Sequence, residues 1–158
     1  GPLCDPEAVA YIHENHRVGD RISMTIGSKV DPINGEPIEL KDAYVVSLSD
    51  GHLVATTPIM PGRKRNLKRT GRIRVGNVDI IVGSVQSQSY DDTMIRMVGI
   101  DPDTCRYIAI KSTNHFRAFF KDHAGLIVPV ETPGIHCADL SIFDYKKIVR
   151  PLFPLDDI

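Results

Sequence analysis

Short runs of strand-forming residues, separated by pairs that favour tight turns, dominate the first half of the sequence. Residues 21–26 alternate between polar and apolar side chains, which is the period of a half-buried strand. Residues 71–75 and 78–82 are also strand-like, and Gly76-Asn77 lies between them. Because a Gly-Asn pair favours a two-residue hairpin turn, the sequence predicts an antiparallel hairpin here.

A second hairpin is predicted around the pair Asp50-Gly51. Residues 38–48 form an apolar, strand-like run, and residues 52–57 form another directly after the pair. Since Asp-Gly is a common hairpin turn, we expect these two runs to be adjacent antiparallel strands. The basic stretch that follows, residues 58–69, is rich in turn formers and is expected to be an irregular loop.

The N-terminal residues predict a helix. Asp5 is a favourable N-cap, Pro6 suits the first helical position, and Glu7 places a negative charge in the first turn. The apolar run 8–12 follows, and a glycine such as Gly19 is a natural place for a helix to end. We therefore expect a short helix that ends near Gly19.

The second half of the sequence predicts a βαβ unit. Residues 90–97 suggest a short helix, residues 106–110 a buried strand, residues 116–123 a helix capped by Asn114, and residues 125–130 a final strand. A strand–helix–strand order favours parallel pairing with a right-handed crossover, whereas the hairpins are antiparallel. The predicted fold class is therefore α+β (mixed α/β), with a mixed, largely antiparallel sheet, hairpins, a C-terminal βαβ unit and flanking helices.

Size and composition predict a single soluble domain that comprises residues 1–158. The net charge is -1 and 42% of the residues are hydrophobic, which does not suit a disordered, membrane-spanning or strongly nucleic-acid-binding protein. Cys4, Cys105 and Cys137 are odd in number and include no Cys-x-x-Cys pair. With no signal peptide at the N-terminus, a reducing, cytoplasmic location is expected.

A polar cluster in the second half is the main functional candidate. It consists of Lys111, Ser112, Asn114, His115 and Arg117, between the predicted strand and the predicted helix. In α/β proteins the side chains beyond the carboxyl end of a strand usually face the ligand-binding crevice. Lysine and arginine can bind an anionic group, and histidine can donate or accept a proton. The structural alternative is that the cations are solvated and the histidine caps the helix.

His13 and His16 invite a metal-binding interpretation, because residues three apart share one face of a helix. The His-Glu-x-x-His zinc motif, however, requires histidines four residues apart. A zinc site also needs at least a third protein ligand, and the sequence offers none nearby. We therefore predict no metal site in this chain.

Positive charge is concentrated between residues 63 and 74. The stretch contains Arg63, Lys64, Arg65, Lys68, Arg69, Arg72 and Arg74. Nucleic-acid binding is disfavoured because no aromatic residues are interleaved and no helix-turn-helix, KH or RNP pattern accompanies the charges. A solvated loop, or a surface for an acidic partner, is the favoured interpretation.

Several short motifs follow one another in a family-specific order. Asp-Pro-Glu at 5–7, Gly-Ser-Lys at 27–29 and Ser-Asp-Gly at 49–51 precede Lys-Ser-Thr-Asn-His-Phe-Arg at 111–117 and Arg-Pro-Leu-Phe-Pro-Leu-Asp at 150–156. In this order they resemble the carboxy-terminal domain of the microcystinase C (MlrC) family of zinc metallopeptidases. The resemblance covers nearly the whole chain. It implies a large bacterial hydrolase, named for cleaving a peptide-type bond in linearised cyclic toxins such as microcystin and nodularin.

The resemblance also implies that the zinc ligands lie in an amino-terminal domain that this sequence does not contain. The expected partner of this chain is therefore that metal-binding domain, and no cofactor or metal ligand is assigned to the chain itself. We expect the chain to form one wall of an interdomain active-site cleft and to be inactive alone. The catalytic candidates are His115 and Arg117, and the substrate-binding candidates are Lys29, Lys111 and Asn114.

Two other functions remain open from the sequence. The chain could be a non-catalytic module that holds an anionic ligand or a partner, or a dimerisation element of a homo-oligomer. Residues 145–155 bear on this choice, because they are too apolar and proline-rich for a solvated tail. We expect them to pack on another surface.

Overall fold

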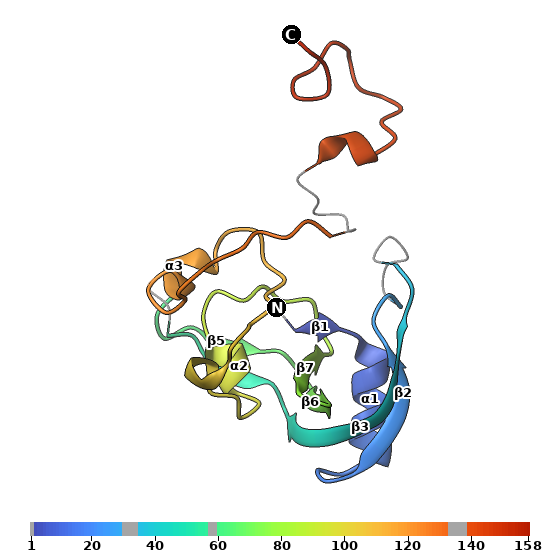
Figure 1. Cartoon of the computed structure of the whole chain (residues 1–158), viewed down its shortest axis with the longest axis vertical. Coiled ribbons are helices and arrows are strands. Elements are labelled where there is room, and N and C mark those ends of the chain that lie inside the picture. Colours follow the sequence, from blue (N-terminus) through green and yellow to red (C-terminus); the bar gives the residue numbers. More distant parts are fainter. Residues whose placement is uncertain (1, 30–34, 57–59, 133–138) are drawn as a thin grey trace.

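The computed structural model describes residues 2–29, 35–56, 60–132 and 139–158 (Figure 1). The strands are β1 (Leu3–Cys4), β2 (Arg21–Ile26), β3 (Ile38–Ser49), β4 (His52–Val54), β5 (Lys64–Asn66), β6 (Thr70–Val75) and β7 (Val78–Gly83). The helices are α1 (Pro6–Asn15), α2 (Thr93–Arg96) and α3 (Arg117–Phe120), with short 3-10 turns η2 (Pro102–Thr104) and η3 (Leu140–Ile142).

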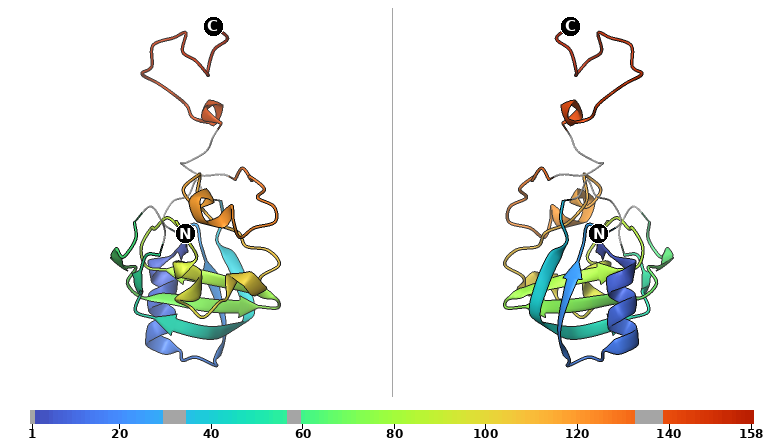
Figure 2. Two further views of the ribbon diagram at one scale, coloured as in Figure 1. Left: turned by 90° about the vertical axis from the view of Figure 1, so that its left-hand side faces the viewer. Right: turned by 90° about the vertical axis from the view of Figure 1, so that its right-hand side faces the viewer.

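Five strands form a curled, mixed sheet in the order β1-β7-β6-β3-β2. Only the β1–β7 pair is parallel, and the other three pairs are antiparallel. Helix α1 lies against the sheet (Figures 1 and 2). The α+β class and the mixed, largely antiparallel sheet predicted from the sequence are confirmed.

Helix α1 is specified by its first residues and held by its apolar face. The Asp5 carboxylate accepts a hydrogen bond from the Ala8 backbone N–H at 2.9 Å, and Pro6 occupies the first helical position. Val9 and Ile12 are fully buried and pack in one core with Val45, Ile73 and Val82 of the sheet, among others. Burying a side chain of this kind stabilises a fold by about 1.5–3 kcal/mol. The helix ends at Asn15, earlier than Gly19.

The hairpin at Gly76-Asn77 is confirmed. Strands β6 and β7 pair in register from Val75 opposite Val78 to Thr70 opposite Gly83. Gly76 has φ +54°, a left-handed conformation that glycine adopts at little cost. Local turn chemistry was therefore sufficient to predict this hairpin.

The hairpin predicted around Gly51 is wrong. Strand β3 pairs with β2 on one side and β6 on the other, so both of its edges are occupied. Strand β4 instead pairs with β5, which lies in the stretch expected to be an irregular loop. Gly51 has φ +81° and lies against the backbone of residues 67–68, so that a Cβ atom there would be 2.0 Å from the Lys68 carbonyl oxygen. The absence of a side chain at Gly51 therefore allows the backbone there to lie close to the backbone of residues 67–68.

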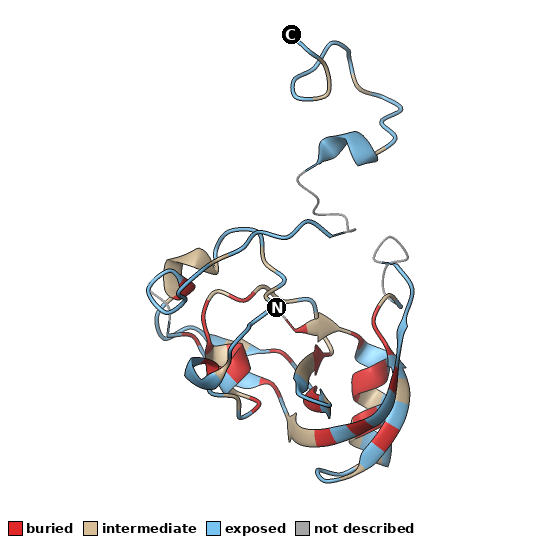
Figure 3. Cartoon of the chain, viewed as in Figure 1, coloured by how far each residue is buried: buried red, intermediate tan, exposed pale blue. Residues whose placement is uncertain are grey.

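The predicted C-terminal βαβ unit is also wrong. In the described part of the chain, residues 106–110 and 125–130 form no strands, and most of their side chains are exposed (Figure 3). Leu126, for example, is 80% exposed. The apolar pattern of both segments favours burial, but no layer formed by the described residues covers them. The parallel pairing of the sheet comes from β1 and β7 instead.

A second, smaller core lies beneath the two-stranded sheet. Leu53, Leu67 and Met94 are buried together, and α2 packs against β4. Residues 139–158, by contrast, extend away from both cores (Figures 1 and 2). Among the described helices, none has the length and apolar character that a bilayer crossing requires.

Candidate functional site

Two members of the polar cluster, Ser112 and His115, lie against the loop that follows β7, and Gln88 of that loop binds both. The Gln88 side-chain amide donates through Nε2 to Ser112 Oγ at 3.0 Å and to His115 Nδ1 at 3.0 Å. Because Nδ1 accepts this bond, the neutral His115 ring carries its proton on Nε2. His115 is exposed, so its Nε2–H can donate to a molecule outside the domain.

A second layer of contacts fixes the same ring from the side. The edge of Tyr90 packs against the His115 ring with the two centroids 5.7 Å apart. Arg65 of β5 lies over Tyr90, 5.2 Å from its centroid, and donates to the Gln88 carbonyl oxygen at 3.3 Å and to Ser87 Oγ. This arginine therefore links the basic stretch to the cluster as a support.

Lys29 lies at the junction between β1 and α1. Its ammonium group is 3.4 Å from Asp5 Oδ2 and 3.5 Å from Glu7 Oε1, and it donates to the Thr25 carbonyl oxygen at 3.2 Å. Asp5 is fully buried and also accepts a hydrogen bond from the Gly27 backbone N–H at 2.9 Å. The N-cap of α1 thus fixes the end of β2 and the position of Lys29.

Lys111 is brought close to this same junction, as its effect on Cys4 shows. Burial and then the neighbouring Asp5 carboxylate raise the pKa of the Cys4 thiol, while the positive charge of Lys111 opposes them. The net effect is a raised pKa, so Cys4 is a neutral thiol at physiological pH and a poor nucleophile. Lys29 and Lys111, two of the sequence candidates, thus each act on a neighbouring residue of this junction, Lys29 on Asp5 and Lys111 on Cys4.

Arg117 and Asn114 are placed differently. Arg117 begins α3, and its guanidinium lies over the Phe116 ring at 5.4 Å from the centroid. Asn114 does not cap α3 with its side chain, because the N-cap residue is Phe116, which makes no side-chain cap bond. Its carbonyl oxygen accepts from the Arg117 backbone N–H at 3.0 Å instead. Within the described residues, the hydrogen bond and the ring contact of the His115 side chain go to Gln88 and Tyr90 and not to Arg117 or Asn114.

His13 of α1 and His16, the residue after the end of α1, have separate partners. His13 Nε2 donates to the Thr70 carbonyl oxygen at 3.1 Å, whereas His16 Nδ1 lies 3.6 Å from Asp20. Across the described ranges, no group of three or more His, Cys, Asp or Glu side chains is arranged to hold a metal ion. The described residues thus offer no ligand set for a zinc ion. Cys137 lies outside the described residues.

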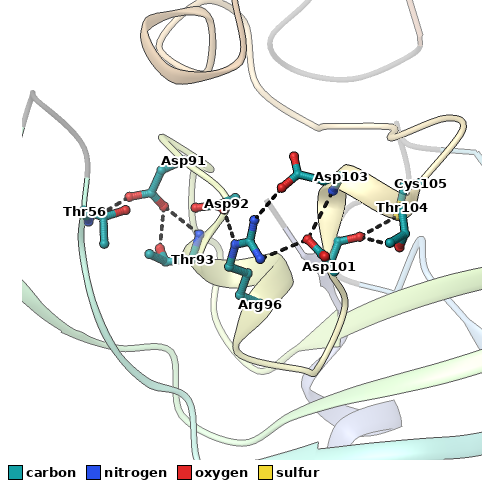
Figure 4. Close-up of polar contacts among 9 residues, drawn as sticks. All are labelled: Thr56, Asp91, Asp92, Thr93, Arg96, Asp101, Asp103, Thr104 and Cys105. Carbon is teal, nitrogen blue, oxygen red and sulfur yellow. Dashed lines mark hydrogen bonds and ion pairs between the residues drawn. The ribbon is translucent and has the colours of Figure 1, made fainter. Parts of the chain in front are cut away.

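A group of carboxylates near α2 is structural (Figure 4). Arg96 binds Asp92, Asp101 at 3.0 Å and Asp103 at 3.2 Å. Asp91, which is buried, accepts from the backbone N–H groups of Thr56 at 3.1 Å and Thr93 at 3.0 Å. These bonds use the carboxylates to join α2 to η2 and to the end of β4.

Sequence reasoning missed the residues that support the site. Gln88 and Tyr90 lie in a polar loop with no motif, so nothing in the sequence distinguishes them from solvated residues. Asp5 was recognised only as a helix cap, although it also binds Gly27 and Lys29. Its position in front of Pro6 gave no sign of these long-range bonds.

Comparison with known proteins decides the family. The family model described as "MlrC C-terminus" matches residues 1–147. The chain belongs to this family. Microcystinase C from Sphingomonas sp. is 29% identical over 158 residues, which are 100% of this chain and 29% of that protein. The resemblance noted in the sequence is therefore confirmed.

A solved structure shares the fold. The crystal structure titled "Putative metallopeptidase", from Mesorhizobium sp. BNC1, matches with a TM-score of 0.82 at 23% sequence identity. The match covers 99% of this chain and 31% of that one. The MlrC C-terminus chain described here thus spans about 30% of the length of the proteins that it matches.

Proposed function

We propose that this chain is the C-terminal domain of a microcystinase C-like, metal-dependent peptidase or amidase, and that it forms one wall of an interdomain active-site cleft. The observation that carries the proposal is His115. Its Nδ1 is held by Gln88, its ring is exposed, and Lys111 lies four residues before it on the same segment. Membership of the MlrC C-terminus family and the greater length of the relatives support the two-part architecture.

The chemistry proposed for this wall is the delivery of one proton and of positive charge. His115 would give a proton from Nε2 to the leaving amine of a cleaved peptide or amide bond in its imidazolium form, which carries protons on both ring nitrogens and becomes a neutral ring after the transfer. In that form Nδ1 is an N–H donor, so the Gln88 amide would turn its Oε1 toward the ring. Lys29, Lys111 and Arg117 would bind a substrate carboxylate or the oxyanion that develops in the transition state, and Asn114 would contact the substrate. The zinc expected in this family is assigned to the upstream part of the protein, and no ligand for it is assigned to this chain.

The test uses the longer protein, because only there can a cleft exist. Arg117→Ala should lower kcat/KM by roughly 10²-fold or more, as the loss of one oxyanion donor typically does. His115→Ala should lower it similarly and also remove one limb of the pH–rate profile. Lys121→Ala is the matched control, since Lys121 is an exposed cation at the other end of α3.

If the polar cluster has only a structural role, different results are expected for the two variants. Both variants would then melt at lower temperature, by an amount that corresponds to about 1–2 kcal/mol of lost local hydrogen bonding. Their folded fractions would keep near-normal kinetics. Normal kcat/KM in stable His115→Ala and Arg117→Ala proteins would rule out the catalytic wall and favour the alternative, a non-catalytic binding or dimerisation module.

A further inference from the structure

Residues 139–158 form an extension that we name the C-terminal arm. Every hydrogen bond and ion pair described for the arm joins two of its own residues. The views in Figures 1 and 2 agree that it projects beyond the sheet and α3. Nothing in the described part of the chain therefore holds the arm in this position.

The end of the arm is nevertheless an ordered loop. Arg150 binds the Asp156 carboxylate and donates to the Leu155 carbonyl oxygen at 3.3 Å. Asp156 Oδ2 accepts from the Leu152 backbone N–H at 2.7 Å, which closes the loop across residues 150–156. We name this closed loop the hook. Its internal bonds fix the backbone in advance, so docking would cost little additional ordering entropy.

The hook presents apolar side chains to the outside. Leu152 is 45% exposed and Phe153 is 74% exposed. Further apolar side chains are exposed along the arm and in the segment before it, namely Leu126, Val128, Val130, Ile142 and Val149. A run of this extent in a soluble protein marks an interaction surface. Covering each large side chain would contribute favourable free energy in proportion to the apolar area removed from water.

The lengths of the matched proteins indicate what covers this surface. The structural match covers 99% of this chain, so it includes the course of most of the arm, and it lies within a protein of which it forms 31%. In such a protein the remaining part is tethered beside the arm at high effective concentration, which favours it over a separate molecule.

We propose that the C-terminal arm is a clasp that docks on the upstream part of the same polypeptide, with Leu152 and Phe153 of the hook as its anchors. The proposal rests on the two-part architecture of the proposed function, but not on its chemistry. The upstream part should have an apolar depression that receives the hook, and further apolar side chains along the course of the arm.

Hydrogen exchange on the longer protein tests the clasp. Backbone amides of the arm should exchange at least about tenfold more slowly than those of an unstructured peptide, and equally slowly when the protein is diluted. The double substitution L152S/F153S should abolish this protection. Val78→Ser is the matched control, because Val78 is 62% exposed at the β6–β7 turn, away from the arm. Peptides from β3 and β6 report in the same samples whether the sheet is intact.

Two outcomes would overturn the clasp. One is fast exchange throughout the arm of the unsubstituted protein, and the other is protection that disappears on dilution, which would assign the surface to a second copy. If the double substitution disrupts the sheet, Phe153→Ala replaces it. Exchange is measured without substrate, so the clasp can fail while the kinetics of the His115 and Arg117 variants still support the catalytic wall, and the converse also holds.

Discussion

At the scale of single residues, the orientation of His115 depends on one side chain. Both N–H groups of the Gln88 amide are used, one by Ser112 and one by His115, and Tyr90 limits the tilt of the ring. Gln88 acts through another residue and is therefore a positioning residue. Its removal should disturb the ring without breaking the sheet.

We predict that Gln88→Leu releases the His115 ring. Without the donor to Nδ1, the neutral ring should populate both tautomers, which nitrogen NMR of residues 1–158 can detect. In the longer protein kcat/KM should fall roughly tenfold or more, because a misplaced proton donor is a poor catalyst. Gln86→Leu is the control, since Gln86 is exposed in the same loop. A single unchanged tautomer in Gln88→Leu would show that Gln88 does not position the ring.

The sequence allowed candidate chemical residues to be chosen for the site, but not the residues that support them. Lys111 and His115 stood out because charged and titratable residues interrupt an apolar run, and this contrast is visible in one dimension. Gln88 did not stand out, because it is distant in sequence from residues 111–117 and contacts them only in the folded chain. The same limit applies to Asp5, whose bond to Gly27 spans 22 positions.

At the scale of elements, local turn signals predicted well only where the neighbouring strand was free to pair. Gly76 lies between two strands that pair with each other, and the hairpin formed as predicted. Gly51 follows β3, whose two edges are already taken by β2 and β6, so the same kind of signal led to the wrong partner. The competition of strands for edges is a global property that turn residues do not encode.

We predict that Gly51→Ala destabilises the fold much more than Gly76→Ala. Both residues have positive φ, which disfavours alanine by about 1–2 kcal/mol. A Cβ at position 51 would in addition lie 2.0 Å from the Lys68 carbonyl oxygen, whereas one at position 76 meets nothing within 4 Å. The total loss at position 51 should therefore be about 2–4 kcal/mol in urea unfolding. Equal losses at the two positions would disprove the close backbone approach.

The ladder between β6 and β7 contains an acid-sensitive group, Asp79. Burial alone would raise the pKa of Asp79, but hydrogen bonds from Arg72 and Arg74 outweigh it and lower the pKa from 3.8 to about 2. Arg72 also donates to the Gly99 carbonyl oxygen at 2.8 Å, which ties the loop after α2 to the sheet. Stabilisation from this lowered pKa is complete above about 3.8 and is lost as the pH falls through about 2.

We predict that Asp79→Asn lowers the free energy of unfolding by up to about 2 kcal/mol at neutral pH. The difference from the unsubstituted chain should shrink as the pH falls from about 4 to about 2, because Asp79 itself becomes neutral. Asp42→Asn removes an ion pair with Arg21 in which both side chains are exposed, and it should change little. A pH-independent difference for Asp79→Asn would contradict the ion-pair explanation.

At the scale of the whole molecule, the described residues form a sheet, the polar cluster and the C-terminal arm, but they include no group of side chains arranged to bind a metal. We predict that residues 1–158 alone retain no stoichiometric zinc after dialysis, since zinc sites in proteins need three or four fixed ligands. Elemental analysis of the dialysed chain, beside the longer protein as the positive control, gives the answer. One zinc per chain that resists mild chelation would place the metal site here.

All five strands of the main sheet lie between residues 3 and 83, and the segments that bear Lys111, His115 and the hook come after them. During synthesis the sheet can therefore close before these later segments have left the ribosome, as domains generally fold from the N-terminal side. A premature stop codon before residue 150 would then yield a folded, protease-resistant sheet without the hook. Proteases that recognise only an unfolded core would not degrade such a product.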